Sequence, residues 1–254
     1  MRCPVCSDSL ALDDATLRCP ALHSFDVARQ GYVNLLGRAA PKNADTAEMV
    51  AARDRFLSAG HYAPIMAALA ERIANAERVL EAGAGTGHYL AAALPSTARG
   101  LAADVSVPAA RRAARADPRV ASVVADTWAG LPVRDATLDA VLCVFAPRNP
   151  AEFLRVLRPG GRVVVVVPNT GHLAELRAEH GLLGIEEDKA ERVESAFGSA
   201  PDVERVTFLT HLDERAATDI VAMGPNAFHG ARDVGATNVT IDVSILTFCP
   251  TLTG

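Results

Sequence analysis

The first 23 residues contain four potential metal ligands in the arrangement C-x2-C-x12-C-x3-H, formed by Cys3, Cys6, Cys19 and His23. Two thiolates separated by two residues bind one side of a tetrahedral ion, and a second pair of ligands completes the coordination. This spacing constrains the fold more than any other feature of the chain, because it ties two turns to one ion. It predicts a small N-terminal zinc ribbon.

Disulfide bonding is the alternative use of these cysteines. It requires an oxidising compartment, and the N-terminal segment MRCPVC has neither the apolar run nor the cleavage site of an export signal. A module this short buries too little apolar surface to fold alone, so we expect a structural zinc ion to supply the missing free energy. The other two cysteines, Cys143 and Cys249, lie in apolar runs and are expected to be small buried hydrophobic residues.

The composition is that of a globular protein. Half of the 254 residues are hydrophobic, and no apolar stretch approaches the roughly 20 residues that a membrane span needs, so we expect no membrane anchor. The formal net charge is -5, yet positions 99–162 hold ten arginines against six acidic residues. Within this stretch Arg111, Arg112 and Arg115 are compatible both with a solvated helix face and with a polyanion contact.

Short apolar segments alternate with alanine-rich helical ones from position 78 onward. Apolar segments without polar alternation, separated by helices, indicate a parallel sheet buried on both faces. We therefore expect an α/β fold, a Rossmann-like doubly wound domain, in which the last two strands pair antiparallel. The expected strands are RVLEA, RGLAAD, ASVVAD, LDAVLCVFA, GGRVVVVVP, VERVTFLTHL and NVTIDVSILTFC.

Three units are expected along the chain. They are the zinc ribbon over 1–36, a helical linker over 37–76 and the α/β domain over 77–254. The ribbon unit ends with QGYVNLL, which fits a short strand or a docking segment. In the linker, Thr46 is placed to cap one helix and Pro64 to begin the next.

A glycine-rich loop, LEAGAGTG, joins the first expected strand to the first helix of the α/β domain. Gly83, Gly85 and Gly87 permit positive φ and let a ligand lie against the backbone, where the helix start offers free N–H groups. A tight strand-to-helix turn would require the same residues. The G-x-G-x-G spacing differs from the dinucleotide pattern, and Glu81 beside the loop favours a ligand with a positively charged end.

Two further carboxylates sharpen this interpretation. Asp104 ends the second strand and is placed to accept the hydroxyls of a ribose, and Asp126 ends the third, near an adenine amino group. Ligands of open α/β sheets bind along this carboxyl edge. We therefore expect the cofactor to be S-adenosylmethionine rather than a nicotinamide dinucleotide, with His88 as a further candidate contact just after the loop.

The chain resembles the bacterial 23S ribosomal RNA (guanine-N1)-methyltransferases. The similarity covers nearly the whole length and is closest to the branch from actinomycete producers of tylosin-type macrolides, including mycinamicin resistance. It implies a class I methyltransferase domain with a mostly parallel seven-stranded sheet behind an N-terminal zinc ribbon. The segments that carry it are RCPVC, LRCPALHSFDVARQGYVNLL, AEMVAARDRFLSAGHYAPI, LEAGAGTGHYL, FAPRNP, LRPGGRVVVVVPNTGHLAEL and VAMGPNAFH.

The resemblance also implies site residues where the motifs match. The ribbon ligands fall on the four residues named above, and cofactor contacts fall on Tyr62, Gly85, Thr86 and His172. Glu81 stands where many members of the family carry Asp, which keeps the charge and lengthens the side chain. Without the resemblance, Tyr62 and His172 would be interpreted as packing or surface residues.

The chemistry of guanine N1 adds requirements. This nitrogen carries a proton at neutral pH, so its attack on a methyl group profits from a general base or from stabilisation of the developing charge on O6. It also lies on the Watson–Crick edge, so the target must be unpaired or flipped from its stack. Catalytic residues remain unidentified, although candidates cluster in two segments: Arg148, Asn149, Asn226, Phe228 and His229, each of which also fits a structural role.

The acceptor implied by the resemblance is a 23S rRNA hairpin loop at the peptide exit tunnel, where methylation would contribute to macrolide resistance. The sequence leaves two alternatives open: a small-molecule methyltransferase, and a cofactor-binding regulatory or ribosome-assembly module without turnover. A cytoplasmic location is expected. The sequence does not specify which guanine is modified, whether the role is resistance or housekeeping, or whether the chain forms a homodimer.

Overall fold

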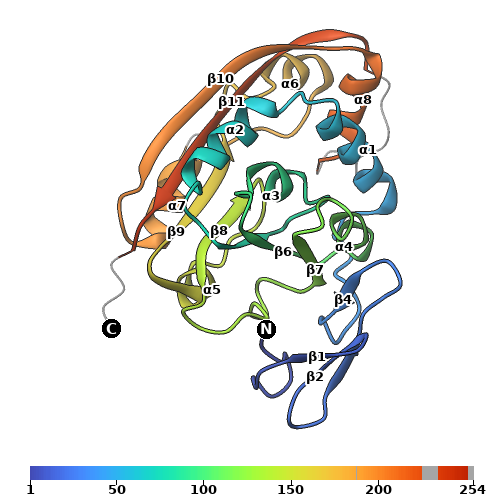
Figure 1. Ribbon diagram of the computed structural model, residues 1–254. Coiled ribbons are helices and arrows are strands. Elements are labelled where there is room, and N and C mark those ends of the chain that lie inside the picture. Colours follow the sequence, from blue (N-terminus) through green and yellow to red (C-terminus); the bar gives the residue numbers. More distant parts are fainter. Residues whose placement is uncertain (187, 225–233, 251–254) are drawn as a thin grey trace.

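The fold is an eight-stranded sheet with helices on both faces and a small three-stranded sheet at one end (Figure 1). The structure is a computed structural model that describes residues 1–186, 188–224 and 234–250. The strand order of the large sheet is β10-β11-β9-β8-β5-β6-β7-β4. Its strands are β4 (Tyr32–Asn34), β5 (Arg78–Ala82), β6 (Arg99–Asp104), β7 (Val120–Val124), β8 (Leu138–Val144), β9 (Leu157–Pro168), β10 (Asp202–Leu212) and β11 (Thr237–Phe248).

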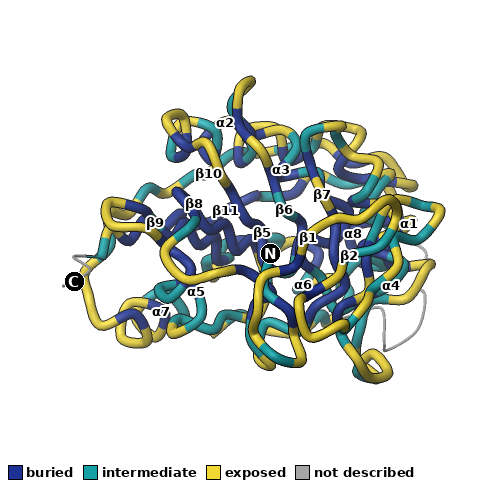
Figure 2. Tube along the Cα trace, turned by 60° about the horizontal axis from the view of Figure 1, so that its bottom comes forward, coloured by how far each residue is buried: buried dark blue, intermediate teal, exposed yellow. Residues whose placement is uncertain are grey.

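The central strands run parallel, as their apolar sequences predict. All seven residues of β8 are buried, and the middle of the sheet is dark blue in Figure 2. The two C-terminal strands β10 and β11 pair antiparallel, and β11 is also antiparallel to β9. The Rossmann-like prediction is therefore confirmed, including its antiparallel end.

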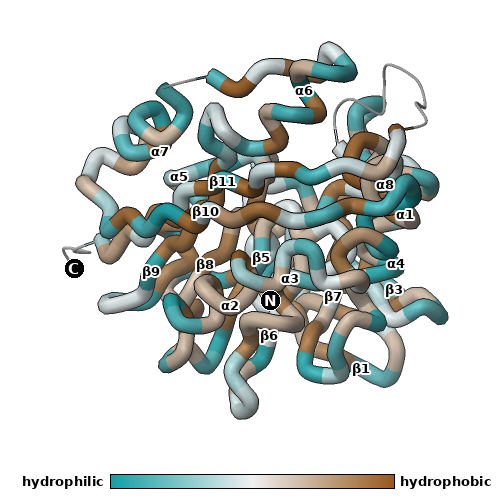
Figure 3. Tube along the Cα trace, turned by 90° about the horizontal axis from the view of Figure 1, so that it is seen from above, coloured by the Kyte–Doolittle hydropathy of each residue, from teal (hydrophilic) through white to brown (hydrophobic). Residues whose placement is uncertain are grey.

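The helices cover both faces of the sheet because each carries an apolar side. Viewed from above, β8 and β9 are mostly hydrophobic, whereas α7 carries several hydrophilic residues (Figure 3). The helices are α1 (Ala47–Ser58), α2 (Ala63–Arg72), α3 (His88–Ala93), α4 (Val107–Ala113), α5 (Pro150–Val156), α6 (Ala174–His180), α7 (Lys189–Phe197) and α8 (Glu214–Ala222). None of the described helices is both long and apolar enough to cross a membrane.

The N-terminal module is continuous with the large sheet. Its hairpin strands are β1 (Ala11–Asp13), β2 (Thr16–Arg18) and β3 (Ser24–Asp26). The segment QGYVNLL supplies β4, which pairs in parallel with β7 and makes the sheet one strand wider than the seven predicted. Cys3, Leu10 and Cys19 lie in the same buried cluster as the core residues Leu131 and Phe153, so the ribbon shares a hydrophobic core with the sheet.

Helices α1 and α2, predicted as a linker, pack on the face of the sheet opposite the cluster that contains the ribbon cysteines. Thr46 accepts a hydrogen bond from the Met49 N–H at 3.3 Å and caps α1. Phe56, Ile65 and Leu69 are fully buried in the core cluster of that face. Burial of this kind holds the segment firmly against the α/β domain, because each large apolar side chain contributes about 1.5–3 kcal/mol.

The start of β5 is held by one buried carboxylate. Asp139 accepts hydrogen bonds from the Glu77 and Arg78 N–H groups, both at 2.7 Å, and forms an ion pair with Arg158. These bonds attach the entry of β5 to the neighbouring strand β8. The position of the glycine loop that follows β5 therefore depends on them.

Replacement of Asp139 by alanine should lower the free energy of unfolding by about 1–3 kcal/mol, because two backbone donors lose their acceptor. The matched variant Asp139→Asn keeps an acceptor oxygen and should cost less than about 1 kcal/mol. Urea denaturation followed by circular dichroism measures both. Equal stability of the two variants would contradict this role of the carboxylate.

Candidate functional site

The glycine loop between β5 and α3 forms a cradle at the carboxyl edge of the sheet. Gly83, Gly85 and Gly87 have φ values of 69°, 54° and 76°. A Cβ atom on Gly83 would lie 2.4 Å from the Cβ atom of Ala146, and one on Gly87 would lie 3.1 Å from that of Ala113. The loop therefore needs glycine both for its backbone conformation and for the close approach of two neighbouring segments.

Two carboxyl groups, one buried and one half-buried, lie at this cradle. Glu81 is fully buried: its Oε2 accepts a hydrogen bond from the Leu90 N–H at 3.1 Å, and its Oε1 has no partner among the described residues. Asp104 accepts hydrogen bonds from the Gly85 and Ser106 N–H groups, both at 2.8 Å. Burial raises the pKa of Glu81 to about 8 and raises that of Asp104 as well. An unpartnered buried carboxyl oxygen favours a ligand that brings a donor or a positive charge.

Arg53 of α1 reaches the same loop, although no motif in the sequence marks it. A Cβ atom on Gly85 would lie 2.9 Å from its Nη1. The guanidinium donates a hydrogen bond to the Met223 carbonyl oxygen at 2.6 Å and forms an ion pair with Asp45. Its charge lowers the pKa of Glu81 in opposition to the larger effect of burial. One cation therefore faces the glycine loop beside the two carboxyl groups.

Tyr62 and His172, which the family resemblance implies as cofactor contacts, lie together although 110 positions separate them. The Tyr62 Oη is 3.2 Å from the His172 Nε2, and the Asp242 N–H donates to the His172 Nδ1 at 3.3 Å. Burial lowers the pKa of His172 to about 4, so the ring is neutral at neutral pH. Since Nδ1 accepts a hydrogen bond, Nε2 carries the proton and donates to Tyr62, whose own hydroxyl proton is left free to donate.

Asp242 holds this pair in place from β11. Its carboxylate accepts hydrogen bonds from Arg205 at 2.7 and 2.8 Å, from Asn169 at 2.9 Å and from Thr207 at 3.0 Å. These donors hold the pKa of Asp242 well below its usual range. The backbone around His172 is thereby fixed by a carboxylate that stays ionised at neutral pH.

Phe145 is the aromatic residue of this edge that sequence reasoning did not select. It follows β8 directly, has a left-handed φ of 53° and is 38% exposed. Its ring stacks on His172 with centroids 5.8 Å apart and lies 6.1 Å from that of Tyr62. A non-glycine residue in this conformation is uncommon and clusters at functional sites. The only signal in the sequence was an aromatic residue at the end of an apolar strand.

The remaining candidates for cofactor binding occupy different surroundings. Thr86 Oγ1 lies 2.9 Å from the Nδ1 of His88, whose Nε2 is 3.0 Å from Ser58 on α1. Burial lowers the pKa of His88. Asp126 forms an ion pair with Arg38 and accepts a hydrogen bond from a backbone N–H nearby. Its carboxylate therefore already has a cationic partner at the end of β7.

The acceptor-side candidates separate into three groups. Asn149 caps α5 through the Glu152 N–H at 3.4 Å and donates to the Thr127 carbonyl at 3.0 Å, so its amide serves the fold. Arg148 lines a pocket beside α7. The other three lie outside the described residues: Asn226, Phe228 and His229.

The cysteines outside the ribbon differ from one another. Cys143 is buried, and burial raises its pKa to about 12, as expected for an inert thiol. Cys249 is exposed, so its predicted burial is wrong. The reason is that β11 ends at Phe248, and the next residue has already left the sheet.

The ribbon brings its four candidate ligands together. The ligand atoms of Cys3, Cys6, Cys19 and His23 all lie within 4.8 Å of one another. The Cys6 and Cys19 Sγ atoms are 3.6 Å apart, and the His23 Nδ1 lies 3.3 Å from the Cys19 Sγ and 3.7 Å from the Cys3 Sγ. Four ligands about 2.0–2.3 Å from one tetrahedral ion have separations of roughly 3.3–3.8 Å. The donor set and its spacing therefore fit zinc.

Two solved structures share the overall fold. One, titled "Conversion of a Disulfide Bond into a Thioacetal Group during Echinomycin Biosynthesis", aligns with a TM-score of 0.54 at 16% identity and covers 75% of this chain and 83% of that chain. A chain from the complex of the Haloferax volcanii Trm112 methyltransferase activator with a methyltransferase aligns with a TM-score of 0.50 at 18% identity and covers 81% and 99%. Similarity at this identity shows the fold alone.

Family and sequence comparisons are more specific. The N-terminal zinc ribbon of RlmA matches residues 1–39, and a methyltransferase domain matches residues 79–161. The 23S rRNA (guanine(748)-N(1))-methyltransferase of Streptomyces fradiae is 48% identical over 90% of this chain and 86% of its own length. A protein of Micromonospora griseorubida, whose name also refers to 23S rRNA (guanine-N1) methylation, is 48% identical over 90% and 87%. From this identity over nearly the full length, the chain belongs to the family of 23S rRNA (guanine-N1)-methyltransferases.

Proposed function

We propose that this enzyme transfers a methyl group from S-adenosylmethionine to N1 of a guanine in 23S rRNA. The observation that carries the proposal is the glycine cradle with the buried Glu81 and the half-buried Asp104, beside which the exposed ring of Phe145 stacks on His172. A cationic cofactor and a planar base would then meet at one edge of the sheet. The names of the relatives, which refer to this base and this atom, support the choice of acceptor.

The cofactor contacts follow from the groups that the cradle leaves free to bind. The unpartnered Glu81 Oε1 binds the amino end of the cofactor, and the Asp104 carboxylate accepts the ribose hydroxyls through its remaining lone pairs. The free hydroxyl proton of Tyr62 is a donor for the cofactor carboxylate. When bound, the cofactor supplies an electrophilic methyl group on its sulfonium. The protein residues serve to bind, orient and shield it from water.

The acceptor guanine is proposed to stack on Phe145. An aromatic ring of this exposure offers one face to a flipped base, which gains about 1–3 kcal/mol from stacking. His172 does not serve as the general base, because one ring nitrogen accepts a hydrogen bond and the other donates one. The proton of guanine N1 therefore leaves to a different acceptor.

We further propose where the methylated guanine lies in the rRNA and what its methylation does for the cell. The target is a hairpin loop of 23S rRNA at the peptide exit tunnel, where a methyl group on the Watson–Crick edge would weaken binding of tylosin-type macrolides. The enzyme works in the cytoplasm, where its rRNA substrate is made. A homodimer remains a prediction.

Methylation is tested by mapping 23S rRNA from a host with and without this enzyme. A new reverse-transcription stop at one guanine is expected, because a methyl on N1 blocks pairing. With an RNA hairpin in vitro, Phe145→Ala should lower kcat/KM by about tenfold to a hundredfold, and Phe145→Tyr should retain most of it. Absence of the new stop in the presence of folded, cofactor-binding enzyme would overturn the proposed acceptor.

Zinc binding is tested with Cys6→Ser, which should lower the metal content from one ion per chain toward zero. Because β4 and the ribbon cysteines belong to the sheet and its core, the change should also reduce the thermal stability of the whole chain. Elemental analysis and calorimetry measure both effects. The exposed Cys249→Ser is the matched control and should keep its zinc. Full zinc content in Cys6→Ser would contradict the assignment.

Cofactor binding should release a proton through Glu81. With a pKa of about 8, its carboxyl group is mostly protonated at pH 7, and a bound positive charge favours the ionised form. The number of protons released on cofactor binding is measured by titration calorimetry in buffers of different ionisation enthalpy. Compared with Glu81→Gln, the wild type should release close to one additional proton at pH 7 and about half a proton at pH 8. The same proton count in both proteins would place the cofactor's charged end elsewhere.

A further inference from the structure

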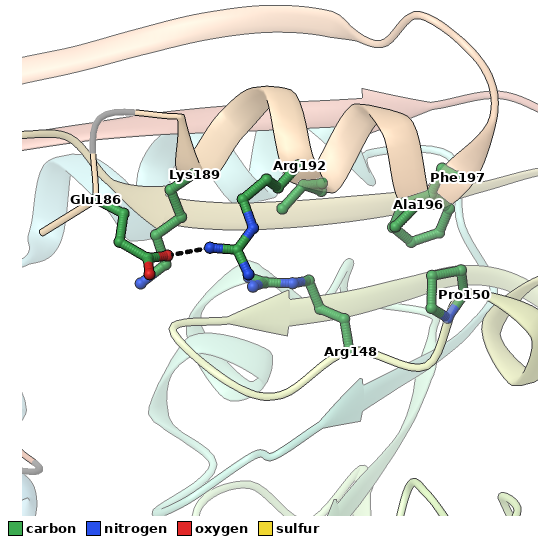
Figure 4. A pocket seen from close by; sticks show the side chains of 8 residues that line it. Arg148, Pro150, Glu186, Lys189, Arg192, Ala196 and Phe197 are labelled. Atoms are coloured by element: carbon green, nitrogen blue, oxygen red, sulfur yellow. Dashed lines mark hydrogen bonds and ion pairs between the residues drawn. The ribbon is translucent and has the colours of Figure 1, made fainter.

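A pocket of about 190 Å³ lies between the segment after β8 and helix α7 (Figure 4). The buried side chains of Val193 and Phe197 form part of its wall, together with Pro150. Its polar groups are Arg148, Glu186, Lys189 and Arg192. The pocket lining therefore combines apolar residues with mainly cationic ones, and the cofactor assignment uses none of them.

The charges of the pocket do not balance. Arg192 forms an ion pair with Glu186, the one carboxylate among the described lining residues, and Arg148 lines the same pocket (Figure 4). Within the described part of the chain, neither Arg148 nor Lys189 has an ion pair. Burial and the charge of Arg148 both lower the pKa of Lys189. Cations held this close repel one another, and a bound anion would relieve that repulsion.

Three other described acidic residues of the same segment lie outside the pocket lining. Asp188, Glu191 and Glu194 lie on or next to α7, but none of them lines the pocket. The whole chain is acidic, with a formal net charge of -5. The pocket is therefore a local concentration of positive charge on a chain that would otherwise repel a polyanion.

The pocket lies next to the proposed acceptor position. Arg148 is three residues beyond Phe145, in the segment that follows β8. Phe145 stacks on His172 at this strand end, with ring centroids 5.8 Å apart. Three residues of chain span at most about 11 Å, so Arg148 cannot lie far from Phe145. An anion in the pocket would thus be close to a base on Phe145.

We propose that the pocket formed by Arg148, Lys189 and Arg192 binds a backbone phosphate of the RNA next to the methylated guanine. The inference rests on the proposed function and adds the contact that sets the position of the strand. S-adenosylmethionine carries no phosphate, so an anion site outside its cradle fits the acceptor rather than the cofactor. Arginine and lysine bind phosphate through charge-assisted hydrogen bonds, and such contacts fix the register of a nucleic acid while base contacts select the target.

The test compares Arg148→Gln and Lys189→Gln with Arg99→Gln. Arg99 is exposed at the start of β6, where it lies at the opposite edge of the sheet from the pocket, and has no ion pair among the described residues. Binding of a fluorescent 23S rRNA hairpin is measured by anisotropy at several salt concentrations, without any methyl transfer. Each pocket variant should bind about tenfold more weakly at low salt, and the slope of log affinity against log salt should be shallower by roughly 0.7 for each phosphate that the variant no longer neutralises. Arg99→Gln should match the wild type.

Cofactor affinity of each variant is measured by calorimetry as the control for folding and should change less than about twofold. If the pocket variants bind RNA with the same affinity and salt slope as Arg99→Gln, the proposed phosphate site is rejected, even if methylation persists. If the wild-type enzyme transfers no methyl group to RNA but the pocket variants still bind RNA more weakly than it does, the phosphate site is supported and the proposed reaction is rejected. A wild-type enzyme without measurable RNA affinity would reject both.

Discussion

The parallel pairing of β5 with β8 is the constraint on which the whole site depends. It sets Glu81 directly beside Leu142, so the loop after β5 and the segment after β8 leave the sheet together. The close approach of Gly83 to Ala146 is the result. One pairing thus places the cradle of the cofactor against the residues proposed to receive the base. A side chain at position 83 would push these two segments apart and separate the two halves of the reaction.

The parts of the site that are local in sequence could be predicted, and the parts that depend on distant contacts could not. The glycine loop and Asp104 are evident from their spacing after apolar strands. Tyr62 and His172 became candidates only through the family resemblance, because nothing near either residue encodes a hydrogen bond across 110 positions. Arg53 was missed for the same reason: its position in an amphipathic helix looks like any solvated arginine until α1 packs beside the loop.

The fold was predicted well where the hydrophobic pattern is strong. The parallel core and its antiparallel end are both visible in the apolar runs. The segment QGYVNLL was recognised as a short strand or docking segment, but its partner β7 could not be identified, because three residues of strand carry no information about their neighbour. Cys249 was misplaced because an apolar run does not reveal the residue at which its strand leaves the core.

The electrostatic arrangement of the carboxyl edge separates two ligands of opposite charge. At the cradle Glu81 is buried and Asp104 is half-buried, and this low solvent exposure strengthens their attraction for a cationic cofactor. Arg148 and Lys189 line a separate pocket suited to an anion. Arg53, the cation at the cradle, is paired with Asp45, whereas further unpaired cations there would repel the sulfonium, and further carboxylates in the pocket would repel the RNA backbone. A chain that is acidic overall can therefore act on a polyanion, because the sign of charge is set locally at each place where a ligand binds.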